Sequence, residues 1–267
     1  MSARETIEAA RATAAAELKL IALPGIPLVR AGDDLARLAL DALARCGERL
    51  QDGDVLVVAQ KIVSKSEGRL VRLASVVPSE SALALARETG KDPRLVELIL
   101  SESTEVVRHA REVVVVAHKL GFVMANAGID QSNVDHDGGD AALLLPRDPD
   151  ASCAALRRAL RERTGADVGV IVNDSHGRAW RNGTVGVALG VAGLPALLDL
   201  RGRPDLFERK LRITEVGLAD ELAAAASLLM GQADEGRPVV LVRGAPYPRR
   251  DGSASELVRA RERDLFR

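Results

Sequence analysis

The sequence predicts a mixed α/β fold, with mixed sheets and flanking helices. Short apolar runs bounded by turn residues predict buried strands, and stretches with apolar residues at helical spacing predict helices. The two kinds of segment do not alternate strictly, which favours an α+β arrangement over a regular βαβ series. With 267 residues, 47% of them hydrophobic and 28% charged, the chain has the composition of a globular protein with a sizeable core.

Strands are predicted where apolar runs meet turn residues, as where Pro24 and Gly25 stop the first run. Helices are predicted where apolar residues recur at helical spacing, as in the stretch that opens with the acids Asp33 and Asp34. In the first half of the chain the expected elements are a strand at 18–23, a helix at 35–46, a buried strand at 55–59 and helices near 79–90 and 93–102.

The second half continues the irregular order. An Ala-rich stretch at 215–230 predicts a helix that packs closely against another element. The other expected elements are strands at 112–118, 121–125, 168–172 and 238–242, a helix at 148–163 and a Gly-punctuated region at 177–202. We divide the chain into an extension at 1–17, a main domain at 18–250 and a helical tail at 251–267.

Composition excludes several classes of protein. Aromatic residues make up 2% of the chain and the formal net charge is −1, which counts against a nucleic-acid partner. Cys46 and Cys153 are far apart, so we expect neither a zinc site nor a disulfide framework. The charged N-terminus and the short apolar run at 185–198 predict no signal peptide and no membrane span, and hence a cytoplasmic protein.

The first segment with candidate functional residues is 58–69, where a buried strand is followed by Lys61, Lys65, two serines and Arg69. Ligands of α/β proteins bind where strands end, and lysines suit phosphate or carboxylate. Alternatively, these charges only solvate the exit of the strand.

The second segment is 125–133, where small residues and Gly128 allow a ligand to approach the backbone. Asp130 and Asn133 then offer oxygen ligands, or form an Asx-type turn that closes a strand.

The third segment is 170–181. An apolar strand delivers Asp174 and Ser175 at its end, and a carboxylate beside a hydroxyl suits Mg²⁺ or Mn²⁺ next to a triphosphate. Arg178 and Arg181 are candidates for substrate carboxylates or phosphates. We expect the lone His176 to be a loop residue and Trp180, the only tryptophan, to pack.

The familiar nucleotide-binding signatures are absent. Gly90-Lys91 is followed by Asp92, so there is no P-loop, and Gly186, Gly190 and Gly193 lack the spacing of a Rossmann fingerprint. The residues therefore indicate a metal and a phosphate-bearing ligand without naming the reaction.

Together these segments resemble the coenzyme F420-0:L-glutamate ligase family over residues 20–245. The resemblance implies that family's unusual α/β fold in an intertwined homodimer. It also implies a GTP-dependent ligase that adds L-glutamate to the lactyl carboxylate of coenzyme F420-0 through an acyl phosphate, adds further glutamates by γ-linkage, and releases GDP and phosphate. The segments that carry it are 23–26 with 32–34, 53–58 leading to Ser64-Lys65, 125–133, 173–181, and 219–222 running to 230–231.

The resemblance also implies the site residues. Lys65, Asp130 and Asp174 form the catalytic group, with Asp130 and Asp174 on one divalent cation, Mg²⁺ or Mn²⁺. Ser175 binds a second divalent cation with help from Gln232, and K⁺ is a further candidate cation. The implied GTP contacts are Leu23, Pro24, Gly25, Ile26, Gln60, Lys65, Asn133, Leu228, Leu229, Met230, Gly231, Gln232, Ala233, Asp234 and Glu235.

Two other functions remain open from the sequence. A nucleotide-dependent kinase for a small acid would use the same metals and lysines, and would stop at the phosphorylated product. A non-catalytic nucleotide-binding protein would use its aspartates as turn formers. Phosphate release that depends on glutamate separates the ligase from both.

Overall fold

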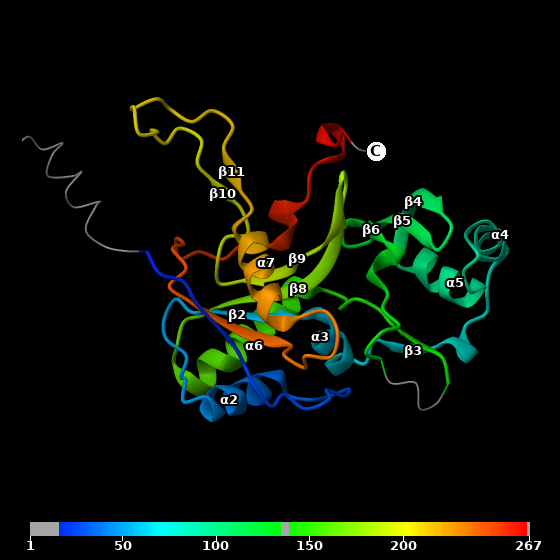
Figure 1. The fold of residues 1–267 in the computed structure, drawn as a ribbon, viewed down its shortest axis with the longest axis horizontal. Coiled ribbons are helices and arrows are strands. Elements are labelled where there is room, and N and C mark those ends of the chain that lie inside the picture. Colours follow the sequence, from blue (N-terminus) through cyan, green and yellow to red (C-terminus); the bar gives the residue numbers. More distant parts are fainter. Residues whose placement is uncertain (1–15, 135–138, 266–267) are drawn as a thin grey trace, which may run out of the picture.

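The computed structural model describes residues 16–134 and 139–265 and is built around a five-stranded sheet (Figure 1). Most of the extension expected at 1–17 lies outside the described residues. Only β2 and β8 run parallel, while the other neighbouring strands are antiparallel. This mixed sheet confirms the predicted α/β class. The strand order is β1 (Lys19–Ala22), β12 (Val239–Arg243), β2 (Val55–Ala59), β8 (Gly169–Arg178) and β9 (Arg181–Ala192).

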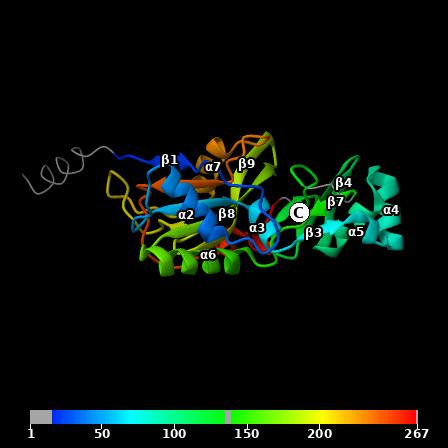
Figure 2. The same cartoon turned by 90° about the horizontal axis from the view of Figure 1, so that it is seen from below.

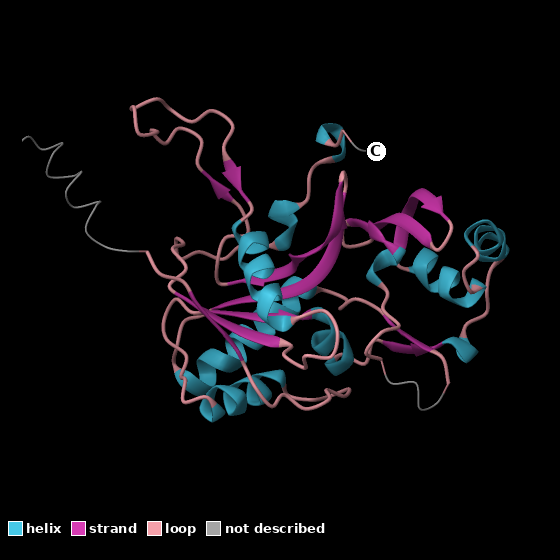
Figure 3. Ribbon diagram, viewed as in Figure 1, coloured by secondary structure: helices cyan, strands magenta, loops and turns pink. Residues whose placement is uncertain are grey.

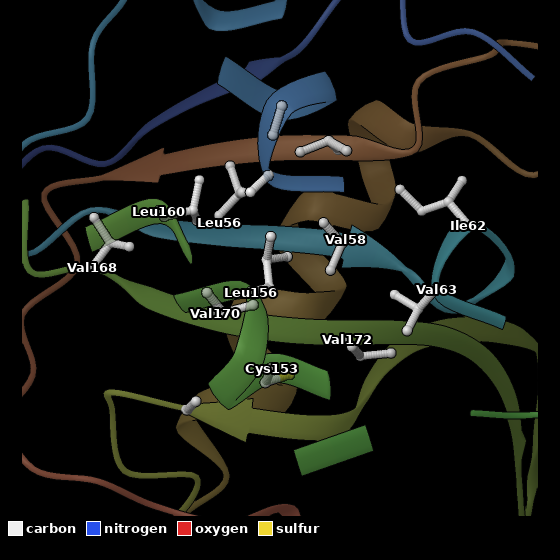
Figure 4. Packing of buried hydrophobic residues seen from close by; sticks show 14 of the residues in the cluster. Leu56, Val58, Ile62, Val63, Cys153, Leu156, Leu160, Val168, Val170 and Val172 are labelled. Atoms are coloured by element: carbon white, nitrogen blue, oxygen red, sulfur yellow. The ribbon is translucent and has the colours of Figure 1, made fainter. Parts of the chain in front are cut away.

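Helices cover both faces of this sheet (Figures 1 and 2). Successive strand residues point to opposite faces, so Leu56 and Val58 join a core with α2 (Leu35–Arg45) and α6 (Pro149–Thr164). Figure 4 shows this packing around Leu56, Val58, Val170 and Leu156. Val55 and Val57 face the other way, into a second core with the Ala-rich helix α7 (Leu218–Met230). The unbroken apolar run of β2 therefore reflects burial on both faces.

A second, smaller layer lies beside one end of the sheet, at the right of Figure 1. It has its own apolar core, which includes Leu98, Ile99 and Val116. Its members are β3 (Leu70–Arg72), α4 (Glu80–Thr89), α5 (Pro93–Ser101), β4 (Ser103–Ala110), β5 (Val113–His118), β6 (Val123–Ala125) and β7 (Ala141–Leu143). β4, β5 and β6 form one antiparallel sheet, and β3 pairs with β7.

Helix ends follow the local sequence. Asp34 caps α2 by accepting a hydrogen bond from the backbone N–H of Arg37, and Asp148 caps α6 in the same way through Ala151. α6 ends at Gly165, whose φ of 76° needs a residue without Cβ. None of the helices in the described ranges combines the length and the apolar character that crossing a membrane requires.

Several expectations were wrong in detail (Figure 3). The charged strand exit after Ala59 is the helix α3 (Gln60–Ser66). β8 does not end at Val172 but continues to Arg178, and the Gly-punctuated region contains its hairpin partner β9. β4 had no apolar signal to predict it. The helix expected from 215 begins at Leu218, because Glu215–Val216 forms β11 against β10 (Leu198–Asp199). Residues 251–265 hold two 3₁₀ turns, Ala254–Leu257 and Arg261–Arg263.

Candidate active site

The segments that the sequence singled out gather at one end of the five-stranded sheet. Ala22 pairs with Val240, Val58 pairs with Val239, and Ala59 pairs with Asn173. These pairings place four segments at the same end of the sheet: the C-terminal ends of β1 and β2, the middle of β8 and the loop before β12. Ligands of open α/β sheets bind at the carboxyl ends of the strands.

Beside this edge, a pocket of about 840 Å³ lies between the β4–β5–β6 sheet and the β8–β9 hairpin. Val107, Val115 and Val123 give it an apolar wall. Its polar lining consists of Asp130, Asp174, Ser175, His176, Arg108, Arg178 and Asp264 together with Asn126. Trp180 also lines the pocket, but it is 87% exposed, so the expectation that it packs was wrong. A concave apolar site with a few convergent polar groups is the usual form of a small-molecule site.

Asp130 is held from three directions. Its backbone exchanges hydrogen bonds with Leu143, at 3.0 Å from its N–H and 2.8 Å to its carbonyl. Its carboxylate accepts a hydrogen bond from Gln60 Nε2 at 2.7 Å and pairs with Lys61 Nζ at 3.0 Å, both from α3. Burial raises the pKa of Asp130, the charge of Lys61 lowers it, and the nearby charge of Asp174 raises it further.

Asp174 faces the same pocket from β8. The two aspartates come from different sheets and not from neighbouring strands of one sheet. Asp130 follows the β4–β5–β6 sheet, whereas Asp174 belongs to the large sheet. The carboxylates still interact, since each lines the pocket and the Asp174 charge acts on Asp130.

His176 is not the loop residue that we expected. It lies on β8, and its Nε2 is 3.5 Å from Oδ2 of Asp174. Within the described residues, this buried nitrogen has no hydrogen-bond partner. Lys61, one of the two lysines that the sequence suggested for a phosphate or carboxylate, pairs with the Asp130 carboxylate at this site.

The donor atoms here suit a hard divalent cation. Asp130, Asp174 and Ser175 all line one pocket, and carboxylate and hydroxyl oxygens are ligands that Mg²⁺ and Mn²⁺ prefer. Burial is the main cause of the raised pKa of Asp130 and the charge of Asp174 adds to it, and a bound cation would oppose both effects. Across the described ranges, no cluster of three or more His, Cys, Asp or Glu side chains is placed to hold a metal, so such an ion would rely on two carboxylates and on non-acidic donors.

A second chain of contacts links three predicted nucleotide segments. Lys65 Nζ donates to the carbonyl of Asn133 at 2.7 Å, and Asn133 Nδ2 donates to the carbonyl of Ala233 at 2.9 Å. Asn133 has a φ of 54°, a left-handed conformation that Asn tolerates. The structure thus brings α3, the loop after Asp130 and the loop after α7 together.

Other predicted nucleotide residues have varied surroundings. Gln60 is 1% exposed, and Ser64 donates to its Oε1 at 2.9 Å, so its carboxamide is engaged inside the protein. Leu23 is buried at the end of β1, and the carbonyls of Pro24 and Gly25 accept hydrogen bonds from Arg45. Ile26 packs against the core under α2.

The loop after α7 is more open. Leu228 is 85% exposed, Leu229 is partly buried and Met230 is buried. Gly231 caps the helix, and the Glu235 carboxylate accepts a hydrogen bond from the backbone N–H of Ala233, which lowers the pKa of Glu235. Asp234 is exposed. Gln232 donates to Ser227 Oγ at 3.1 Å, and it is not part of the lining of the Asp130–Asp174 pocket among the residues described.

Comparison with known proteins gives a consistent result. A family model described as F420-0:Gamma-glutamyl ligase matches residues 25–244. A protein of Methanothermobacter thermautotrophicus named coenzyme F420:L-glutamate ligase is 53% identical over 94% of this chain and 99% of its own length. Proteins of the same name from Methanocaldococcus jannaschii and Archaeoglobus fulgidus are 45% and 44% identical, over 82% and 94% of this chain and 86% and 96% of their own lengths.

Proposed function

Because this chain belongs to the F420-0:gamma-glutamyl ligase family, we propose that it joins L-glutamate to coenzyme F420-0 in an amide bond. The names of relatives that match 94% of the chain support this activity. The observation that carries the proposal within the structure is the pocket, where Asp130 and Asp174 meet beside the Lys65–Asn133–Ala233 contacts.

We further propose that GTP activates the acceptor. Its γ-phosphoryl group is transferred to the terminal carboxylate of F420-0, which gives an acyl phosphate and GDP. The amine of glutamate attacks the acyl carbon, the C–O bond to phosphate breaks, and inorganic phosphate leaves with the electron pair. The glutamate ammonium group loses two of its three protons to solvent overall, and the amide nitrogen keeps the third. γ-Linked extension repeats the same steps on the newly added glutamate.

The residues of the chain have distinct parts in this scheme. Asp130 and Asp174 would hold one divalent cation and Ser175 a second, and these ions would neutralise charge on the phosphates. Gln60 and Lys61 fix the Asp130 carboxylate at 2.7 and 3.0 Å, so it is oriented before any ligand arrives. Lys65, on the same helix, supplies a further positive charge toward the nucleotide.

The test is a reaction with GTP, Mn²⁺ or Mg²⁺, F420-0 and L-glutamate, with product masses and released phosphate as readouts. We expect one or more added glutamates, with phosphate release that depends on glutamate. Comparable turnover with ATP would remove the preference for GTP. A stable phosphorylated acid formed equally well without glutamate would refute the ligase in favour of a kinase, and nucleotide binding without turnover would refute any enzyme.

We also propose that the protein works as a cytoplasmic homodimer. The unpaired state of Cys46 and Cys153 suits a reducing compartment. Light scattering at micromolar concentration tests the assembly, and a monomer mass would contradict it.

A further inference from the structure

Arg178 offers the pocket a buried hydrogen-bond donor that is unsatisfied within the described part of the chain. The residue lies on the last position of β8 and lines the 840 Å³ pocket. Its NH1 nitrogen is buried, and in the described part of the chain it has no hydrogen-bond partner. An unmatched buried donor on a guanidinium is costly, and an anion that enters the pocket would satisfy it.

Charged residues of opposite sign lie at different positions along β8, on the side of the strand that lines the pocket. Asp174, His176 and Arg178 alternate on β8 and are each partly buried, while Ser175 and Gly177 between them are exposed. Residues four apart on a strand are separated by about 13 Å. Asp130 adds a second carboxylate at the Asp174 end, and Arg108 of β4 adds a second guanidinium to the pocket wall. Two carboxylates therefore lie at the Asp174 end of this segment of β8 and a guanidinium lies at its other end, while Asp264 is a third carboxylate in the pocket lining.

This arrangement suits an amino acid whose charges are far apart. In the proposed reaction, the amine has to reach the acyl phosphate at the end of the pocket where Asp130 and Asp174 lie. The carboxylates of the amino acid are attracted to a guanidinium, which pairs with a carboxylate through two parallel hydrogen bonds. Of the two carboxylates of glutamate, the one on the side chain lies farther from the amine and so reaches farther toward Arg178.

We propose that Arg178 binds the side-chain carboxylate of the incoming L-glutamate and thereby sets the preference of the enzyme for glutamate over glutamine. This inference rests on the proposed ligase function and names a specificity residue for it. Because the incoming amino acid is the same in each round, Arg178 acts in the first addition and in every γ-linked extension.

The test is the ratio of kcat/KM for L-glutamate to kcat/KM for L-glutamine in wild type, R178Q, R178K and R181Q. The ratio is measured within one preparation, so partial misfolding of a variant cancels. We expect R178Q to lower the ratio at least about tenfold, as for loss of a charge-assisted hydrogen bond. R178K should retain more of the preference than R178Q, because it keeps the charge.

R181Q is the matched control. The sequence suggested Arg181 as well as Arg178 for substrate binding, but Arg181 is exposed and is not among the described residues that line the pocket. It faces Arg178 across the hairpin. Its ratio should stay within about threefold of wild type, the effect expected of an exposed charge. An unchanged ratio in R178Q, or a rise in KM for F420-0 without a change in the ratio, would overturn the inference and leave the ligase function intact.

Direct binding separates the two proposals. Calorimetric titration of L-glutamate into wild type and R178Q, with Mg²⁺ and a non-hydrolysable GTP analogue present, does not need turnover. Weaker binding to R178Q in a protein that makes no product would refute the ligase function and retain the carboxylate site. Equal glutamate binding to both proteins would overturn the carboxylate site.

Discussion

Replacing Asp174 with Asn should weaken metal binding about 100-fold without weakening the metal-free fold. On β8, Oδ2 of Asp174 lies 3.5 Å from Nε2 of His176. The charge of Asp174 acts unfavourably on Asp130, whose pKa it raises. Asn keeps the shape of the side chain and removes that repulsion, so the melting temperature of the metal-free protein should stay the same or rise.

The magnitude follows from linkage. A cation at about 100 times its Kd stabilises the folded state by about 2.7 kcal/mol. For a chain of this size, each kcal/mol corresponds to roughly 2–4 °C, so Mn²⁺ should raise the melting temperature of the wild type by about 5–10 °C. If Asn weakens the site about 100-fold, the same Mn²⁺ concentration stabilises by only about 0.4 kcal/mol, or roughly 1 °C.

The assay is thermal unfolding of wild type and D174N across a Mn²⁺ series, with a chelator in the metal-free samples. D41N is the matched control, because Asp41 is exposed on α2, away from the pocket. A metal-free D174N that melts several degrees lower would show a structural carboxylate. Full Mn²⁺ stabilisation in D174N would show that Asp174 is not a ligand, and either result refutes the reasoning.

Three further predictions concern other contacts. Lys65→Ala should weaken GTP binding about tenfold more than GDP binding if Lys65 reaches the outer phosphate, as for a hydrogen bond to a charged partner; equal losses below threefold in calorimetry would contradict this. Asp54→Asn breaks a two-point pair in which Arg243 Nε and NH2 lie 2.9 and 2.8 Å from a carboxylate that is 2% exposed. Urea unfolding should show a loss of about 3 kcal/mol or more, and a loss below about 1 kcal/mol would show that the pair is not a stabilising contact. Burial, with the charges of Arg69 and Lys119, lowers the pKa of His118 to about 4. The unfolded chain therefore binds the proton first as pH falls below about 6.5, so the unfolding free energy should drop by about 1–2 kcal/mol between pH 7 and 5, and His118→Gln should flatten that dependence.

The elements that the sequence predicted well have an uninterrupted apolar run or begin at a capping residue. β2 was predicted at its true bounds because both of its faces are buried, so no polar residue interrupts the run. The ends of α2 and α6 were near their predicted positions because Asp34 and Asp148 are true caps. In such places, local preference and tertiary packing agree.

The site itself was harder to predict, because there the residues needed for the pocket interrupt the apolar pattern of the strands. β8 continues through Asn173–Arg178, whose polar side chains serve the pocket and so hide the strand. In β9, Gly186 and Gly190 looked like loop residues. A Cβ at Gly186 would lie 2.5 Å from the carbonyl oxygen of Ala223 on α7, and one at Gly190 would collide with Pro149. These glycines allow close packing of β9 against helices, and the position of those helices cannot be predicted from the sequence pattern.

The order of strands in the large sheet has a consequence for synthesis of the chain. β12, near the C-terminal end, lies between β1 and β2, so β2 has one open edge until residue 243 has been made. At typical translation rates, the interval from β2 to β12 lasts on the order of 10–40 s. During this time an apolar strand with an unpaired edge is available to neighbouring nascent chains. We therefore expect the yield of folded protein to depend on chaperones that shield β2 during elongation, and not only on the stability of the finished fold.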